Sequence, residues 1–328
     1  MTTMPANLPG LVRTLVRSPL NFLCNLADAP VIVLVYHRVA RLASDPEMLA
    51  VTPENFRAQM RHLKENVTLV RFEDDWAKGP RPAVAVTFDD GYADNALEAL
   101  PILEEVGVPA TFFVSTGTIG TSRKFWWDEL EGIIMEGRQL PSRFTLNDGG
   151  FGKSWPTGTE RERQQFYRDI VPFMKSIDPE RREGWLAQLR RWAESGDEGD
   201  QTHRAMTVEE LRLLAGSDLV TVGAHTVTHS RLSALTVAAQ QEEIEVSKRQ
   251  LEAWLGREIT VISYPYGKRS DYTDETVALC RKAGFSKAAA NFPGQAHRWT
   301  DPYRIPRLLV RDWPQEEFAA RLRGVWTR

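Results

Sequence analysis

The sequence predicts an α/β fold built on a parallel sheet. Short apolar runs rich in β-branched residues alternate along the chain with amphipathic segments of helical period. Polar residues capable of catalysis or metal binding follow directly on several of these runs. Strands that recur after each helix are expected to pair in parallel, because a helical crossover returns the chain to the same end of the sheet.

The first third of the chain contains three predicted strands and two predicted helices. The run VIVLVY at 31–36 is almost wholly apolar, which fits a strand buried on both faces. In the helix that opens at Pro53, Phe56, Met60 and Leu63 share one face. The other elements are strands at 83–88 (AVAVTF) and 110–114 (ATFFV) and a helix over 95–106 that ends at Gly107.

The same alternation resumes after residue 206. Gly284 follows the second predicted helix of this part, and glycine readily adopts the left-handed conformation that ends helices. The predicted elements are strands at 219–224, 260–263 and near 305–310, with helices over 237–255 and 273–283.

Between residues 121 and 206 the alternation breaks, which predicts a mostly helical insertion within one domain spanning residues 1–328. The insertion contains charged helical runs and a glycine-rich turn at 147–152. Its tryptophans have two interpretations: they form the core of the insertion, or their flat rings form a wall on which sugars stack. They are Trp126, Trp127, Trp155, Trp185 and Trp192.

Charge and composition exclude several functional classes. The chain has 41 Lys and Arg against 44 Asp and Glu, with neither sign gathered into a block, so a nucleic-acid-binding surface is not expected. Cys24 and Cys280 lack the spacing of a zinc finger or redox pair. Residues 11–26 are apolar but interrupted by two arginines, and no run reaches the roughly 20 residues that span a bilayer. We expect a cytoplasmic protein whose N-terminal segment contacts membranes at most peripherally.

Two histidines four residues apart indicate a metal site. In HTVTH, His225 and His229 share one side if the chain turns into a helix. Two histidines and one carboxylate leave positions open for water and substrate, as a hydrolytic metal site requires. We assign the carboxylate to Asp90. The alternative is a pair of surface histidines, or a pair bonded to the backbone at a helix start.

Adjacent carboxylates follow the predicted strand at 83–88. In TFDDG, one aspartate can bind a metal while its neighbour faces the activated water. The alternative is a simple turn at the end of the strand, for which Asp-Gly is common. The two histidines favour the catalytic interpretation, because the carboxyl ends of parallel strands form the face where active sites lie. His37 and the YPYG segment at 264–267 also follow predicted strands.

Three motifs in this order resemble the polysaccharide deacetylases of carbohydrate esterase family four. They are TFDDGY at 87–92, GAHTVTH at 223–229 and SYPYG at 263–267. The resemblance covers residues 31–118 and 207–310 and leaves out the insertion. It implies a distorted TIM-like barrel with fewer than eight strands. It also implies a divalent metal, which we take to be Zn²⁺, with Co²⁺, Ni²⁺ and Mn²⁺ as alternatives.

The resemblance also implies a role for each motif residue. Asp89 is the general base, and the metal ligands are Asp90, His225 and His229. Tyr266 offers its backbone N–H to the oxyanion that forms on the attacked amide.

The sequence departs from the usual family pattern at two places. The arginine two residues before the proline of the third motif is missing, and so is the late Leu-x-x-His that supplies the general acid. One branch of the family looks circularly permuted, with the acid in a first-strand Tyr-His motif that Tyr36 and His37 resemble. We therefore assign His37 as the general acid. The alternatives are a histidine that only fixes the metal site, and His297 as the reserve acid.

Arginines near the last predicted strand can replace the missing guanidinium. Arg307 is our candidate for orienting Asp89, and Arg304 is the second candidate. The alternative role for both is a structural ion pair that closes the barrel. His62 and His203 lie in polar helical surroundings, and we expect both at the surface.

These assignments predict a hydrolase that removes N-acetyl groups from an amino sugar. The substrate is a polysaccharide, oligosaccharide or lipid-linked precursor, as in bacterial exopolysaccharide biosynthesis. Asp89 takes a proton from the metal-activated water, and His37 protonates the amine, which is otherwise a poor leaving group. The alternatives are a deformylase or amidohydrolase acting on another sugar or a cyclic amide, and a saccharide-binding protein that has lost catalysis. The complete set of ligands and base argues against the last.

Overall fold

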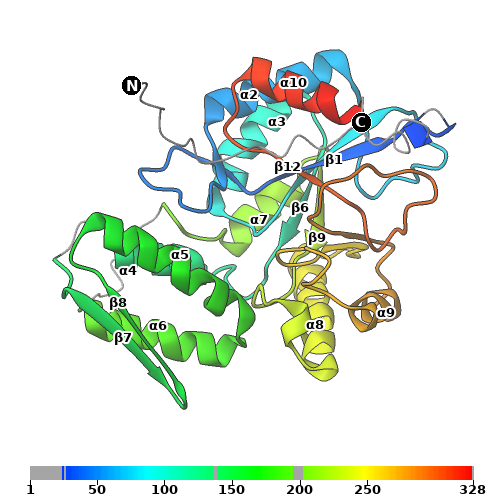
Figure 1. Cartoon of the computed structure of the whole chain (residues 1–328). Coiled ribbons are helices and arrows are strands. Elements are labelled where there is room, and N and C mark those ends of the chain that lie inside the picture. Colours follow the sequence, from blue (N-terminus) through cyan, green and yellow to red (C-terminus); the bar gives the residue numbers. More distant parts are fainter. Residues whose placement is uncertain (1–23, 26, 136–138, 195–201, 327–328) are drawn as a thin grey trace, which may run out of the picture.

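Parallel strands form the centre of the molecule and close into a barrel. The computed structural model describes residues 24–25, 27–135, 139–194 and 202–326 (Figure 1). The strands of its main sheet are β1 (Val31–Tyr36), β4 (Thr68–Leu69), β5 (Ala83–Phe88), β6 (Ala110–Val114), β9 (Val220–Ala224), β10 (Val261–Ser263), β11 (Lys287–Ala289) and β12 (Leu308–Leu309). Their order is β11-β10-β9-β6-β5-β1-β12, with β4 beside β5. A parallel bridge from Ala289 to Ile305 brings the two ends of this order together.

This sheet confirms the predicted α/β fold and the distorted TIM-like barrel. Strands β1, β5 and β6 have the predicted bounds, and every residue in them is buried. Apolar runs of this kind suit strands that are covered on both faces. The strand β11 was not predicted, because KAA is too short and too weakly apolar to stand out from its surroundings.

Helices surround the barrel, and four of them lie where the sequence predicts helices. The surrounding helices are α2 (Pro53–Asn66), α3 (Leu100–Val106), α7 (Val208–Ala215), α8 (Val237–Leu255), α9 (Asp274–Lys282) and α10 (Gln315–Trp326). The predicted helix 95–106 begins as a π-helical turn, Asn95–Ala99, before continuing as α3. Helices α7 and α10 were not predicted, nor was the small parallel pair β2 (Arg38–Val39) and β3 (Ala50–Val51).

The described residues of the segment 121–206 form a lobe beside the barrel (Figure 1). Helices predominate in it, as predicted: α4 (Trp126–Met135), α5 (Glu160–Ser176) and α6 (Pro179–Ala193). A hairpin of β7 (Arg143–Asp148) and β8 (Phe151–Pro156) joins α4 to α5 through the glycine-rich turn. Trp155 and Trp185 are buried in this lobe, where they pack against Phe166 and Phe151 with ring centroids 4.9 and 5.2 Å apart. For these two tryptophans, the structure agrees with the core interpretation.

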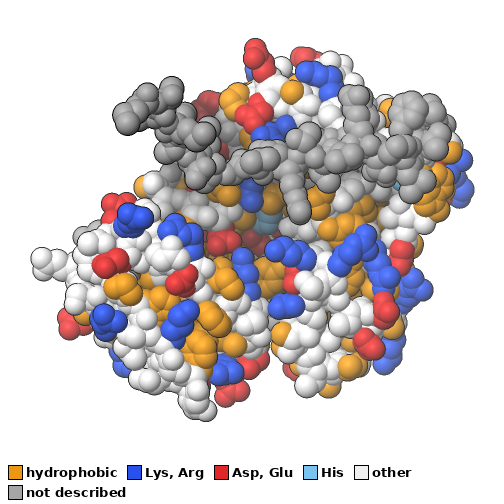
Figure 2. All heavy atoms as spheres, in the orientation of Figure 1, with side chains coloured by type: hydrophobic (Ala, Val, Ile, Leu, Met, Phe, Trp, Pro, Cys, Tyr) orange, Lys and Arg blue, Asp and Glu red, His pale blue; other side chains and the backbone are white. Residues whose placement is uncertain are grey.

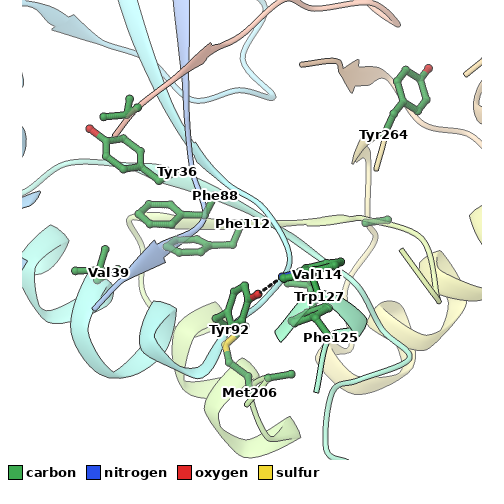
Figure 3. Close-up of a cluster of buried hydrophobic side chains, with 14 of the residues drawn as sticks. Tyr36, Val39, Phe88, Tyr92, Phe112, Val114, Phe125, Trp127, Met206 and Tyr264 are labelled. Carbon is green, nitrogen blue, oxygen red and sulfur yellow. Dashed lines mark hydrogen bonds between the residues drawn. The ribbon is translucent and has the colours of Figure 1, made fainter. Parts of the chain in front are cut away.

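Aromatic side chains fill the barrel wall below the site. Phe88 and Phe112 stack with centroids 4.5 Å apart, and Tyr36 lies 5.4 Å from Phe88 (Figure 3). These residues stand on β5, β6 and β1, so their packing fixes the ends of the strands that carry the site. Among the described residues, no helix has the length and apolar character needed to cross a bilayer. Most of the 11–26 segment lies outside these residues.

Candidate functional site

Three side chains from two strand ends meet at one point of the barrel rim. The Oδ1 atom of Asp90 lies 3.5 Å from Nε2 of His225 and 3.3 Å from Nε2 of His229. The three residues are buried, and one possible ligand atom from each lies within 4.8 Å of the others. Figure 2 shows a hollow between the lobe and the barrel, with a histidine visible in it. The structure therefore brings together the three predicted ligands.

The donor set fits a divalent metal. Oδ1 of Asp90 is buried and has no hydrogen-bond partner among the described residues, although a buried carboxylate oxygen needs a cation or a donor. Burial lowers the pKa of His229 to about 4, which keeps its imidazole neutral and able to bind a metal. Two imidazole nitrogens and one carboxylate oxygen suit Zn²⁺ and also accept Co²⁺, Ni²⁺ or Mn²⁺.

The two histidines are aligned by an irregular loop, so the expectation of a helical turn is wrong. Thr226 and His229 have left-handed φ values of 64° and 52°. Two backbone N–H groups after β6 hold this loop: Thr116 donates to Thr226 O at 3.1 Å and Gly117 to Val227 O at 2.8 Å. A Cβ on Gly117 would lie 2.6 Å from that Val227 oxygen, so the contact requires glycine.

Arg307 and Asp89 form a buried bidentate ion pair. Arg307 Nη1 donates to Asp89 Oδ1 at 2.8 Å, and Nη2 donates to Oδ2 at 2.6 Å. The guanidinium also donates to Ser263 Oγ and Ala290 O, each at 2.8 Å. Burial opposes ionisation of Asp89, but Arg307 and His225 hold its pKa below the ordinary value. The guanidinium lies where an orienting group for Asp89 is needed, and its role in catalysis stays a prediction.

His37 lies beside Asp89 because their strands pair in register. Tyr36 pairs with Phe88, and the Asp89 N–H donates to Tyr36 O at 3.0 Å. Burial lowers the pKa of His37, while Asp90 and Asp89 act in the opposite direction. The position suits a general acid, and that role also stays a prediction.

The reserve acid, His297, lies at the wrong end of the barrel. Its neighbour Ala296 bridges to Val31, the first residue of β1, whereas His37 follows the last. His297 Nδ1 lies 2.9 Å from Asp28 O. At about 3.3 Å per residue, β1 separates the two histidines by roughly 20 Å. His297 therefore cannot protonate a group held at the metal site.

Tyr266 lies next to the metal ligands. It has a left-handed φ of 60°, and its ring centroid is 4.8 Å from that of His229. In the described part of the chain, no acceptor is found for its backbone N–H. This N–H therefore remains free for the predicted bond to an oxyanion.

Two tryptophans of the lobe belong to the site, which sequence reasoning did not establish. Trp127 packs on His229 with centroids 4.7 Å apart, and its Nε1 donates to Tyr92 OH at 2.7 Å (Figure 3). Trp126 Nε1 donates to Tyr266 OH at 3.1 Å. Both are buried, as the core interpretation predicts, and both contact site residues, while sugar stacking on them stays a prediction.

His203 is part of a buried polar network, so the expectation of a surface position is wrong. Its Nδ1 lies 2.9 Å from Arg38 Nη1 and 3.3 Å from Asp128 Oδ1. Asp128 also accepts a 2.7 Å bond from Tyr92 OH. Buried charges of this kind need partners, and His203 supplies one. His62 is half-buried on α2 near Phe318.

Arg304 does not reach the site. It pairs with Asp274 at the start of α9 and with Asp301 at 3.8 Å. About a third of its side chain is exposed. The alternative of a structural ion pair describes its position.

Two comparisons with known protein sequences match the chain to polysaccharide deacetylases. The family model for polysaccharide deacetylase matches residues 77–171 and 188–288. YxkH of Bacillus subtilis (strain 168), assigned to the polysaccharide deacetylases, is 23% identical over 287 residues, covering 85% of this chain and 70% of that protein.

Solved structures share the fold. The deacetylase PplD of Streptococcus pyogenes, solved with acetate, is 16% identical with a TM-score of 0.57, covering 91% of this chain and 99% of that one. IcaB of Ammonifex degensii is 18% identical with a TM-score of 0.55, covering 91% and 97%. With the family model matching more than half of its residues, this chain belongs to the polysaccharide deacetylase family.

Proposed function

We propose that this chain is a metal-dependent hydrolase that removes N-acetyl groups from an amino sugar of a polysaccharide, oligosaccharide or lipid-linked precursor. The observation that carries the proposal is the meeting of Asp90, His225 and His229 beside the Asp89–Arg307 pair. A metal site next to an oriented, ionised carboxylate is the arrangement that amide hydrolysis requires.

The residues of the chain divide the reaction between them. A divalent metal held by Asp90, His225 and His229 would supply a Lewis acid and lower the pKa of water. Asp89, kept ionised by Arg307, accepts the proton of the attacking water. The N–H of Tyr266 donates to the amide oxygen as negative charge develops there.

His37 completes the reaction by protonating the departing nitrogen. Burial keeps the pKa of this imidazole below its ordinary value, so its protonated form is a stronger acid toward the amine. The products are acetate and a free amino sugar.

The rings around the metal ligands support a saccharide as the substrate. Tyr266 packs on His229 and is hydrogen-bonded to Trp126, so flat apolar surfaces stand beside the reacting position. Such rings suit the apolar face of a pyranose. PplD, which shares the fold, is a deacetylase whose structure was solved with acetate.

Metal content and acetate release test the proposal together. Wild type should bind one Zn²⁺ and release acetate from chitooligosaccharides or from a lipid-linked N-acetylhexosamine. Asp89→Asn should keep the metal and lose about 10²–10⁴-fold in activity, because the base is gone. His225→Ala should lose the metal, and His37→Gln should keep it while losing about 10²-fold or more in activity.

Each failure has a defined meaning. A wild type without stoichiometric metal contradicts the mechanism. A wild type that binds metal and releases formate or another acid, but no acetate, contradicts the acetyl assignment. The proposal of a metal-dependent hydrolase would still hold.

A further inference from the structure

Helix α8 reaches the loop between the two histidine ligands through one side chain, Glu243. Its Oε2 accepts the backbone N–H groups of Val227 at 2.8 Å and Thr228 at 2.9 Å. Its Oε1 accepts the Thr228 hydroxyl at 2.6 Å. We infer that Glu243 is a positioning residue for the metal site, one that fixes His229 through the backbone of the loop. The inference rests on the proposed metal site.

The contacts suit a carboxylate, which can accept three hydrogen bonds at once. The loop presents two N–H groups and one hydroxyl, and a carboxylate has acceptor sites for all three. Since the Thr228 proton points to Glu243, the 2.7 Å contact between Thr228 Oγ1 and Ser230 Oγ has Ser230 as its donor. Glu243 is only 8% exposed, so water does not replace it without rearrangement.

The loop needs support on both sides because its backbone is strained. Thr226 and His229 both have positive φ values, which residues other than glycine rarely adopt. Such conformations persist where the surroundings determine them. The carbonyl groups of the loop are held by residues after β6, and Glu243 holds its N–H groups.

The two histidines differ in how their second nitrogen is held. His225 Nδ1 lies 2.8 Å from Ser263 O, the bond that usually orients a metal-bound histidine. His229 Nδ1 is buried and has no hydrogen-bond partner among the described residues. The ring of His229 is held by packing against Trp127 and Tyr266, so its remaining restraint is the backbone that Glu243 fixes.

Zinc affinity of the full chain tests the inference, measured by competition with a chromogenic chelator. Glu243→Ala should weaken Zn²⁺ binding about 10–100-fold, the usual loss for a group that supports a metal ligand. Glu242→Ala is the matched control. Glu242 is the exposed neighbour of Glu243 on the same helix, and its substitution removes the same charge. It should leave the affinity unchanged.

Glu243→Gln should rescue most of the affinity. Its amide oxygen can accept both N–H groups while its NH₂ group donates to Thr228, whose hydroxyl then turns toward Ser230. Thr228→Val keeps both N–H bonds and should weaken binding only about 3–10-fold. These two variants decide the question if Glu243→Ala does not fold.

Melting temperatures with and without Zn²⁺ separate positioning from general stability. A positioning role predicts that Glu243→Ala loses part of the increase in Tm that Zn²⁺ gives wild type. Equal affinity in wild type, Glu243→Ala and Thr228→Val would overturn the inference, even if the apo protein were less stable. Wild type that binds no Zn²⁺ would instead refute the proposed function.

Discussion

The barrel and the lobe contribute to the site in different ways. The barrel supplies every residue to which we assign metal binding or proton transfer, and each follows a strand or lies near one. The lobe supplies Trp126 and Trp127, which contact Tyr266 and His229 but carry no such chemistry. The residues at the strand ends therefore determine which reaction can be catalysed. The lobe supplies the aromatic rings that pack around the proposed ligands.

The largest effect should follow from Arg307→Met, a change in the barrel. It leaves the buried Asp89 without its counter-ion, and we expect the free energy of unfolding to fall by about 3–5 kcal/mol. Acetate release should fall about 10²-fold or more, because the base loses its orientation and its charge is no longer favoured. Chemical denaturation and acetate assays measure the two effects.

The double variant Asp89→Asn/Arg307→Met is the control for this prediction. It removes both charges, so stability should partly return while activity stays low. Full activity in Arg307→Met would show that the Asp89–Arg307 pair is structural only.

A smaller effect should come from Trp127→Phe in the lobe. The change removes the Nε1 bond to Tyr92 and part of the ring contact with His229. We expect kcat/KM for acetate release to fall about 3–10-fold, which corresponds to one net hydrogen bond.

Trp155→Phe is the matched variant for Trp127→Phe. Trp155 is similarly buried in the lobe, but its Nε1 has no partner among the described residues and it packs on Phe166. Turnover should stay within a factor of about two of wild type. Equal losses in both variants would mean that the lobe acts as one unit and that the contact of Trp127 with His229 has no special effect on turnover.

The smallest effect on turnover should come from Glu131→Gln on α4. Burial raises the pKa of Glu131 to about 7, above the ordinary value for the unfolded chain. The folded state therefore disfavours the ionised form, and this cost grows as pH rises from about 4.5 to about 7.

The gain in stability should accordingly depend on pH. Glu131→Gln should raise the free energy of unfolding by up to about 3 kcal/mol at pH 8 and by less than about 1 kcal/mol at pH 5. Denaturation at the two pH values measures the difference. A gain that is equal at both, or a loss of activity, would contradict this account of Glu131.

The barrel could be predicted from sequence because its strands are buried on both faces. Runs such as 31–36 and 83–88 carry an uninterrupted apolar signal, and the polar residues after them lie at one rim by the rules of parallel sheets. The proximity of Asp90, His225 and His229 followed from that argument. The placement of Arg307 beside Asp89 was predicted from the family pattern and is found in the structure.

The remainder depends on contacts that leave no local pattern. The left-handed Thr226 and His229 are neither glycine nor asparagine, so nothing in HTVTH distinguishes a loop from a helical turn. His203 and Asp128 are 75 residues apart, and only tertiary packing brings them together. His297 was a candidate acid because its sequence position does not show that its loop lies at the opposite end of β1 from His37.

The separation of 218 positions between Asp89 and Arg307 has a consequence for how the chain emerges during synthesis. All three proposed metal ligands leave the ribosome before the guanidinium does, because Arg307 lies just before the last strand to pair with β1. Until this residue has been synthesised, the carboxylate of Asp89 lacks the counter-ion that compensates its charge in the finished barrel. Synthesis of the segment that carries Arg307 therefore determines when the barrel can close around a compensated Asp89.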